Sequence, residues 1–390
     1  MTQLGAVTLR RTYWYCDSCG TAVVPADAAW EVPATGASFG ARAAAALLGT
    51  VVPSFARAAD LLAALTPMTL SARSLESYTE TLGDAYTLPV LAPDDPGPAA
   101  DLLVVEVDGG HLPFRGDGWR EAKAVMAWRE VAGVAQPPRY AAVQGAWATH
   151  EDVVWAVARR EGARQARTIL CLADGNRLQW AMLEGLFPHA VFLLDWYHLL
   201  EHVGAVAALL PDGDAWQQAQ RAALWERGPR ETLRALLGLL RDAALPAATR
   251  ELVRQCFGYL WHNRHRMAYA EARQRGYPCG SGRIESGIKQ VLQARLKGPG
   301  MRWDHDHAQA MLNAVCAWLS GDWALACTQV KVQACGPPAP PRVGPRTRPR
   351  LARAGLLPPP PPSRRVAVPR PPGLSTRQAA AIVKRAMRLR

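Results

Sequence analysis

Long hydrophobic runs, a secretory leader and the cysteine pattern of a disulfide scaffold are all lacking in this chain of 390 residues. No stretch reaches the roughly 18 charge-free apolar residues of a membrane-spanning helix. Arg10 and Arg11 are not followed by the apolar segment of a signal peptide. The eight cysteines are scattered, unlike those of a secreted disulfide scaffold. These absences favour a soluble cytoplasmic protein with reduced thiols, long enough for two or three domains.

Acidic residues are missing from one end of the chain. Residues 331–390 contain fourteen Lys and Arg but no Asp or Glu, so the net charge of +12 belongs to this tail and residues 1–330 carry −2. DNA binding by the rest of the chain would therefore depend on local basic patches. The tail is rich in Pro and Arg, with five consecutive prolines at 358–362. Such a composition cannot form a hydrophobic core, which predicts a disordered tail over 331–390.

A second Cys-x-x-Cys pair is also absent, although residues 1–30 contain one. Cys16 and Cys19, followed by Gly20, form half of a zinc-ribbon knuckle in an aromatic, strand-like segment. A structural zinc site needs four ligands. The segment is therefore a ribbon-like zinc site, a metal-free hairpin or the remnant of a truncated ribbon.

Residues 31–95 are expected to form a small helical domain. Ala and Leu recur at helical spacing, with one helix from Ser54 to Leu65 and a second, capped by Ser71, through Leu82. This helix–turn–helix pattern suggests DNA contact, and a plain helical pair is the alternative.

Residues 96–330 have the pattern of an α/β domain, in which the long helical segment 199–275 is expected to be an all-helical insertion. Three apolar strands are followed by alternating helices and strands, which predicts a mixed sheet with an antiparallel start and a parallel remainder. The expected strands cover residues 102–107, 122–131, 140–145, 168–173 and 190–194.

Acidic residues follow two of these strands and begin a later helix. Asp108 and Asp174 each precede Gly at the end of a strand, and Glu285 follows a Gly-Ser-Gly turn. Open α/β sheets place their ligands at the carboxyl ends of strands. Three carboxylates suit a pair of Mg²⁺ (or Mn²⁺) ions for phosphodiester chemistry. Glu106 is a rival ligand, because it shares strand parity with Asp108.

A further cluster reads Asp195-Trp196-Tyr197-His198 and ends a strand. Asp195 could orient His198 beside a phosphate or a water, or the two could simply brace the start of a helix. His198, Glu201 and His202 also match the H-x-x-E-H pattern of certain zinc proteases, a remote alternative for the whole chain.

Basic residues with interleaved aromatics lie near the end of the helical insertion, and further basic residues follow Glu285. Their composition is that of a surface that grips a DNA strand, and a solvated helix face is the alternative. The candidate DNA-binding residues are Arg264, Arg266, Lys289, Arg295, Lys297 and Arg302.

These motifs together resemble a family of bacterial insertion-sequence transposases, the Kra type, and more loosely the Mutator-like transposases. The resemblance covers about residues 8–323. It rests on the segments Gly280-Ser-Gly-Arg-Ile-Glu-Ser286, Arg295-Leu-Lys-Gly-Pro-Gly-Met-Arg-Trp303, Leu194-Asp-Trp-Tyr-His198, Ala173-Asp-Gly175, Val107-Asp-Gly109, Asn263-Arg-x-Arg-Met-x-Tyr269 and the entry around Cys16 and Cys19.

The resemblance implies a ribonuclease-H-like catalytic core and a DDE triad made of Asp108, Asp174 and Glu285. It also implies Mg²⁺-dependent cleavage and transfer of DNA strands at terminal inverted repeats, with the protein acting as a dimer or larger assembly on DNA. The chain departs from the family in its abrupt start and in its Arg/Pro tail, which suggests a frameshifted or fused end. A decayed or domesticated copy that binds DNA without cutting it is the alternative function.

Overall fold

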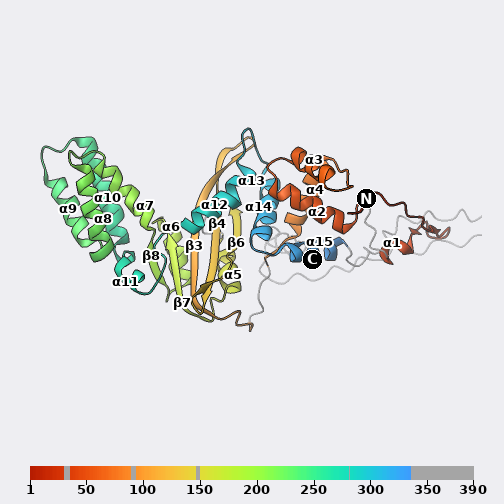
Figure 1. The fold of residues 1–390 in the computed structure, drawn as a ribbon, viewed down its shortest axis with the longest axis horizontal. Coiled ribbons are helices and arrows are strands. Elements are labelled where there is room, and N and C mark those ends of the chain that lie inside the picture. Colours follow the sequence, from red (N-terminus) through yellow and green to blue (C-terminus); the bar gives the residue numbers. More distant parts are fainter. Residues whose placement is uncertain (30–35, 89–93, 146–149, 281, 335–390) are drawn as a thin grey trace, which may run out of the picture. The chain divides into compact units, whose positions relative to one another are not determined.

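The computed structural model describes residues 1–29, 36–88, 94–145, 150–280 and 282–334 (Figure 1). By its internal contacts the chain divides into two compact units, Met1–Pro338 and Ala339–Arg390, and every described residue belongs to the first. The predicted disordered tail lies outside the described residues from position 335 onward, and so does Ser281 of the Gly-Ser-Gly turn.

A six-stranded sheet forms the centre of the first unit. Its strands are β3 (Ala100–Phe114), β4 (Gly118–Val131), β5 (Val134–Ala135), β6 (Arg139–Gln144), β7 (Ala166–Ala173) and β8 (Val191–Leu194). The order is β5-β4-β3-β7-β8, and β6 also pairs with β4. The pairs of β4 with β3 and β6 are antiparallel, whereas β3–β7 and β7–β8 are parallel. The predicted mixed α/β architecture, antiparallel first and parallel afterwards, is confirmed.

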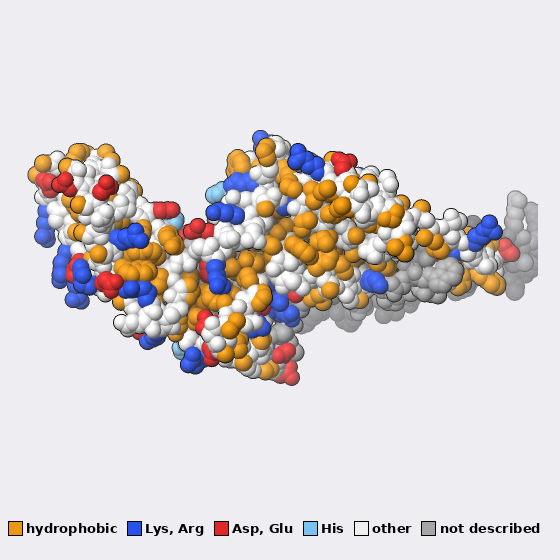
Figure 2. Space-filling model, in the orientation of Figure 1, with side chains coloured by type: hydrophobic (Ala, Val, Ile, Leu, Met, Phe, Trp, Pro, Cys, Tyr) orange, Lys and Arg blue, Asp and Glu red, His pale blue; other side chains and the backbone are white. Residues whose placement is uncertain are grey.

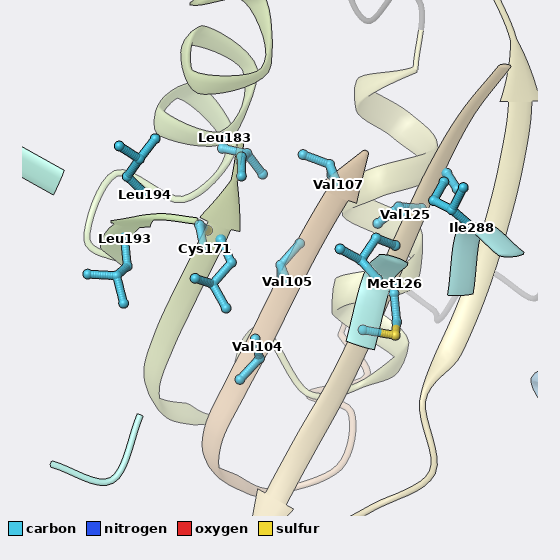
Figure 3. Close-up of a cluster of buried hydrophobic side chains, with 14 of the residues drawn as sticks. Val104, Val105, Val107, Val125, Met126, Cys171, Leu183, Leu193, Leu194 and Ile288 are labelled. Atoms are coloured by element: carbon cyan, nitrogen blue, oxygen red, sulfur yellow. The ribbon is translucent and has the colours of Figure 1, made fainter. Parts of the chain in front are cut away.

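The hydrophobic core lies on both sides of the central strand. Residues 102–107 of β3 are all buried, as expected for a strand covered on both faces. Figure 3 shows side chains of β3, β4, β7 and β8 meeting Leu183 and Ile288, which come from helices on either side of the insertion in sequence. The strand is longer than predicted, because pairing with β4 continues past the two glycines to Phe114.

Several further helices lie outside the insertion and the N-terminal group. They are α5 (Glu151–Arg160), α6 (Arg177–Leu186), α12 (Gly282–Ile288), the π-helical turn η3 (Lys289–Gln293), α13 (Ala294–Leu296), α14 (His305–Leu319) and α15 (Trp323–Ala334). α5 packs on β4 and β6, α14 packs on β6, and α12 lies over β3 and β4 (Figure 1). Gly110 permits this close approach, since a Cβ there would lie 2.8 Å from Cδ1 of Leu292.

The helical insertion lies between β8 and α12 in the chain and is all-helical over its described length. It contains α7 (Trp196–Ala207), α8 (Gly213–Arg227), α9 (Arg230–Arg241), α10 (Ala247–Asn263), the short 3-10 turn Arg264–Arg266 and α11 (Tyr269–Gln274). Asp195 caps α7 by accepting a hydrogen bond from the backbone N–H of His198 over 2.6 Å. The Tyr269 hydroxyl donates to the Leu194 carbonyl over 2.9 Å, which ties the end of the insertion back to β8.

Three N-terminal helices begin at serine caps, as the sequence predicted for the third. α2 (Phe39–Val51), α3 (Phe55–Leu65) and α4 (Ala72–Ala85) are capped by the side chains of Ser38, Ser54 and Ser71. α4 packs on α2 and on α14. The chain starts with the hairpin β1 (Trp14–Tyr15) and β2 (Ala22–Val23), followed by α1 (Pro25–Ala29). Within the described residues, the helices are too short or too polar to cross a membrane.

Candidate active site

Three aspartates lie at matching register positions of three neighbouring parallel strands. Glu106 pairs with Leu172 and Ala173 pairs with Leu194, so the register sets Asp108, which lies inside β3, beside Asp174 and Asp195, which directly follow β7 and β8. Adjacent strands lie about 4.8 Å apart. The topology therefore collects carboxyl groups at one edge of the sheet although they are distant in sequence.

Asp108 is the most enclosed of the three predicted triad members. Its pKa is raised to about 6, first because the carboxyl is buried and then because Asp174 and Glu285 place negative charge near it. The backbone N–H of Gly109 donates to Oδ1 of Asp108 over 2.6 Å, and His198 also favours the charged form. The charges of the other two predicted triad acids thus both reach Asp108.

Glu285 reaches this group because the start of α12 is fixed on β3. The backbone N–H of Ile284, the residue before Glu285, donates to Oε2 of Glu106 over 3.3 Å. Just upstream, the Cys279 carbonyl accepts from the Trp196 backbone N–H over 3.0 Å. These two contacts hold the loop and the first turn of α12 beside β3 and β8, with Glu285 exposed on the outer side.

Glu106, the alternative metal ligand, is buried and hydrogen-bonded within the protein. Its side chain is buried, and Oε1 accepts from Nε1 of Trp128 over 3.2 Å while Oε2 accepts from Ile284. Burial raises the pKa of this carboxyl to about 7. Both oxygens are therefore committed to hydrogen bonds beneath α12, and Glu106 positions Glu285 instead of facing the acids at the sheet edge.

Asp174 is held by its own loop and by the insertion. Its Oδ1 accepts from the Asn176 backbone N–H over 2.9 Å, and its carbonyl accepts from the Tyr259 hydroxyl over 2.7 Å. Gly175 has φ +99°, and a Cβ on it would lie 2.6 Å from the Tyr259 ring. Tyr259, on α10, was not identified from sequence, because no local pattern links it to a strand end 85 residues earlier.

The predicted accessory pair Asp195 and His198 is divided between two roles. Asp195 is buried and caps α7 through the His198 backbone, so it braces the helix start. The His198 side chain is half-buried, lies 3.3 Å from Oε2 of Glu201 through Nδ1, and acts on the Asp108 charge. His202 stacks on Tyr259 with ring centroids 3.9 Å apart, and burial lowers its pKa.

The carboxylates of Asp108, Asp174 and Glu285 are the type of ligand that a divalent ion prefers, but in this structure they lie too far apart to bind one together. No group of three or more His, Cys, Asp or Glu side chains in the described part of the chain is close enough to hold a metal ion. This applies equally to the H-x-x-E-H segment and to the cysteine pair. Burial is the main cause of the raised pKa of Asp108, and the charges of Asp174 and Glu285 add to it. A hard dication would favour the charged form of such a carboxyl. Metal binding there would draw the three carboxyls together.

Four of the six predicted DNA-binding residues are exposed. Arg264 stacks over the Trp261 ring at 4.3 Å, and Lys297 lies over the ring of Trp119 at 5.3 Å. Lys289 and Arg302 are the other exposed members. Figure 2 shows Lys and Arg side chains gathered over α12 and α13, beside acidic side chains at a hollow of this face.

Arg266 and Arg295 depart from the prediction, because both are buried and committed within the protein. Arg266 forms an ion pair with Glu184 of α6, donates to Oδ1 of Asn263 over 2.9 Å and lies 4.5 Å over the Trp180 ring. It fastens the insertion to the central domain at the point where α10 ends. Arg295 donates through Nε to the Gly49 carbonyl over 2.8 Å, which joins α13 to the N-terminal helices.

Cys16 and Cys19 lie exposed at the turn of the β1–β2 hairpin. Sγ of Cys16 is 3.0 Å from Oγ of Ser18, and hydrogen bonds from Ser18 and Cys19 lower the pKa of Cys16 to about 6. A thiol of this kind is a competent zinc ligand, but the described residues supply no further ligands for a complete site.

The chain matches no known protein-family model, and no curated protein matches it. Any functional conclusion therefore depends on the geometry of its own residues.

Proposed function

We propose that this protein is a DNA transposase that cuts and joins DNA strands at the ends of an insertion sequence, with Asp108, Asp174 and Glu285 as its acidic triad. The observation that carries the proposal is the convergence of these three acids from β3, β7 and α12. Two adjacent parallel strands and a helix anchored on one of them bring together residues separated by up to 177 positions. A structural role for such a cluster is a poor alternative, because like charges destabilise one another unless a cation joins them.

The sheet supports a ribonuclease-H-like core. An antiparallel set, β6-β4-β3, continues into the parallel strands β7 and β8, and an all-helical insertion separates β8 from the helix that carries the last acid. This arrangement is what the sequence resemblance to insertion-sequence transposases of the Kra type implies.

Within this proposal, Asp108, Asp174 and Glu285 would hold two Mg²⁺ or Mn²⁺ ions. Such ions, when bound, supply an activated oxygen nucleophile and neutralise charge on the scissile phosphate. His198 would contact the phosphate or move a proton at its imidazole, and its electrostatic effect on Asp108 and its half-buried side chain support this role. Tyr259 and Asn176 keep the Asp174 loop in position.

The exposed cations would bind the DNA. Arg264, Lys289, Lys297 and Arg302 are exposed, two of them beside aromatic rings on which bases or guanidinium groups can stack. The terminal inverted repeats and the target would be its DNA partners in the cytoplasm. Pairing of two element ends requires a dimer or larger assembly.

A strand-cleavage and strand-transfer assay tests the proposal. The substrate is labelled DNA that carries the ends flanking the reading frame, with Mg²⁺ or Mn²⁺. We expect nicks and joined products from the wild type, and none from Asp174→Ala or Glu285→Gln. Asp152→Asn is the matched control, because this acid is exposed on α5, an element that carries none of the triad acids.

Each alternative leaves a distinct result. DNA binding without nicking by the wild type would identify a decayed or domesticated copy. Normal cutting by Glu285→Gln would refute the triad. His202→Ala should leave strand cleavage largely intact, whereas it would abolish the activity of a zinc protease built on His198 and His202.

A further inference from the structure

A pocket of about 690 Å³ lies between the N-terminal helices and the segment that follows α13. It is separate from the acids at the edge of the sheet. Its walls come from the start of α3, the end of β3, α13 and the 299–304 segment, and include Ser54, Phe55, Arg115, Arg295, Arg302 and Trp303. The segment is attached to the sheet, because the Trp303 backbone N–H donates to the Pro113 carbonyl over 3.0 Å and its carbonyl accepts from Arg115 over 2.9 Å.

Arg295 is a buried cation in this wall with one side left unpaired. Its side chain is 3% exposed, and its guanidinium lies over the Phe55 ring at 4.4 Å. Nε and Nη1 donate to the carbonyls of Gly49 and Pro53, at 2.8 and 3.3 Å. Nη2 is buried and has no hydrogen-bond partner among the described residues, and Arg295 is one of the residues that line the pocket. A buried N–H of a charged group without a partner is costly unless an acceptor arrives.

The first turn of α3 opens into the same pocket. Ser54 and Ala56 line it together with Phe55. The first N–H groups of a helix have no intrahelical partners, and Ser54 satisfies only that of Arg57 through its side chain. Eleven residues of α3 add a favourable dipole for an anion at this end.

The lining of the pocket has more positive than negative charge, which favours binding of an anion. Four arginines and two carboxylates line it. Arg73 pairs with Glu76 at 2.8 Å and Arg115 pairs with Asp304 at 3.0 Å, so both carboxylates are already used. His307, the remaining ionisable group, contacts Glu80 of α4. Arg302 is exposed and makes no side-chain hydrogen bond or ion pair with the described residues. Arg295 and Arg302 are thus the two cations that remain for a ligand.

We infer that this pocket binds a phosphate of the DNA backbone several base pairs from the phosphate that is cut. The inference deepens the proposed function and rests on it. The helical rod from Glu285 to Arg295 spans ten residues, or about 15 Å at the rise of a helix. At about 3.4 Å for each base pair, the contacted phosphate lies about four to five base pairs from the active site.

A phosphate bound at this site would fix the number of base pairs between the contacted phosphate and the phosphodiester bond that is cleaved. Because the pocket is shared by the N-terminal helices and α13, one phosphate would bridge the two and fix how DNA enters. A phosphate contact of this kind positions the duplex without reading its sequence.

Two measurements test the inference with the full chain. Binding of inorganic phosphate, followed by isothermal titration at low salt, is expected for the wild type and is expected to be lost in Arg302→Gln. Affinity for the end DNA should fall about three- to tenfold in Arg302→Gln, with the slope against salt reduced by about one. Arg241→Gln, on the exposed end of α9, is the matched control and should leave both values unchanged.

Arg295→Lys is the second variant, checked for folding by its thermal transition, and should also weaken phosphate binding. Unchanged phosphate and DNA affinity in Arg302→Gln would overturn the inference, as would phosphate binding that both variants retain. Interference from neutral methylphosphonates should appear about four to five base pairs from the cut, and interference only elsewhere would also contradict it. Failure of the proposed function can be told apart from failure of this inference, because the phosphate titration does not depend on strand cleavage.

Discussion

The backbone N–H of Ile284 donates to Oε2 of Glu106 over 3.3 Å, and this bond joins the start of α12 to the central strand. Glu285 is the next residue in the helix. The bond therefore decides how far the third acid stands from Asp108, which follows Glu106 by two residues on the same face of β3. Glu106 acts on the site through Glu285 and is a positioning residue.

Replacing Glu106 by Gln separates positioning from metal binding. One of its two acceptor oxygens becomes an amide NH₂ facing either Trp128 or Ile284, so we expect a loss of about 1–3 kcal/mol in the free energy of unfolding at pH 6. Denaturant unfolding measures this. The number of Mn²⁺ ions bound should not change, and loss of Mn²⁺ binding would show that Glu106 is itself a ligand.

Removing the charge of Asp108 should stabilise the metal-free protein at neutral pH. The folded-state pKa of about 6 lies above the ordinary 3.8, so the stabilising contribution of Asp108 is present below pH 4 and is lost as the pH rises through about 6. Asp108→Asn should therefore gain stability over the wild type across that window, reaching about 2–3 kcal/mol at pH 7.

The thermal transition, recorded from pH 4 to 8 without and with Mg²⁺, checks this prediction. Mg²⁺ should raise the transition of the wild type and not that of Asp108→Asn. A variant less stable than the wild type at pH 7 in the absence of metal would contradict the account of Asp108 as a strained acid.

Gly175 is required by both the backbone and its neighbour. An alanine would have to adopt φ near +99° and place its Cβ 2.6 Å from the Tyr259 ring. We expect Gly175→Ala to displace the Asp174 loop and to lower strand cleavage strongly, while Tyr259→Phe removes only the 2.7 Å hydrogen bond and lowers it mildly. Cleavage rates of the two variants give the comparison, and equal rates would exclude this packing constraint.

Two neighbouring arginines should behave oppositely. Arg266→Met removes the closer of the two ion-pair contacts of Glu184 and leaves Asn263 Oδ1 without its arginine donor, so the free energy of unfolding should fall by about 1–3 kcal/mol. Arg264→Ala, at an exposed position, should leave stability within about 0.5 kcal/mol and should weaken DNA binding. If Arg264→Ala lost stability and Arg266→Met did not, the structural role assigned to Arg266 would be wrong.

Local pattern was sufficient for several features of the fold. Serine followed by apolar helical spacing located the starts of α3 and α4, and apolar runs ending at Asp located β3, β7 and β8. Strand parity could not separate Glu106 from Asp108, because both face α12 and only tertiary packing covers the first. The burial of Arg266 and Arg295 could not be predicted for the same reason, since their partners lie 82 and 246 positions away in the chain.

The end of α10 shows a similar limit. The sequence shows no break near residue 264 within the helical insertion 199–275, yet α10 ends at Asn263 and the next α-helix begins at Tyr269. Arg266 turns inward to Glu184, and the Tyr269 hydroxyl is bound to Leu194, so contacts with the central domain bend the chain between them.

The central claim is that Asp108, Asp174 and Glu285 close around divalent ions. The most direct measurement is the number of Mn²⁺ ions bound by the full chain in the presence of its end DNA, counted by electron paramagnetic resonance. The account predicts two ions for the wild type and a loss of binding in both Asp174→Asn and Glu285→Gln, with Asp152→Asn unchanged. Equal Mn²⁺ binding by the wild type and the two triad variants would contradict it.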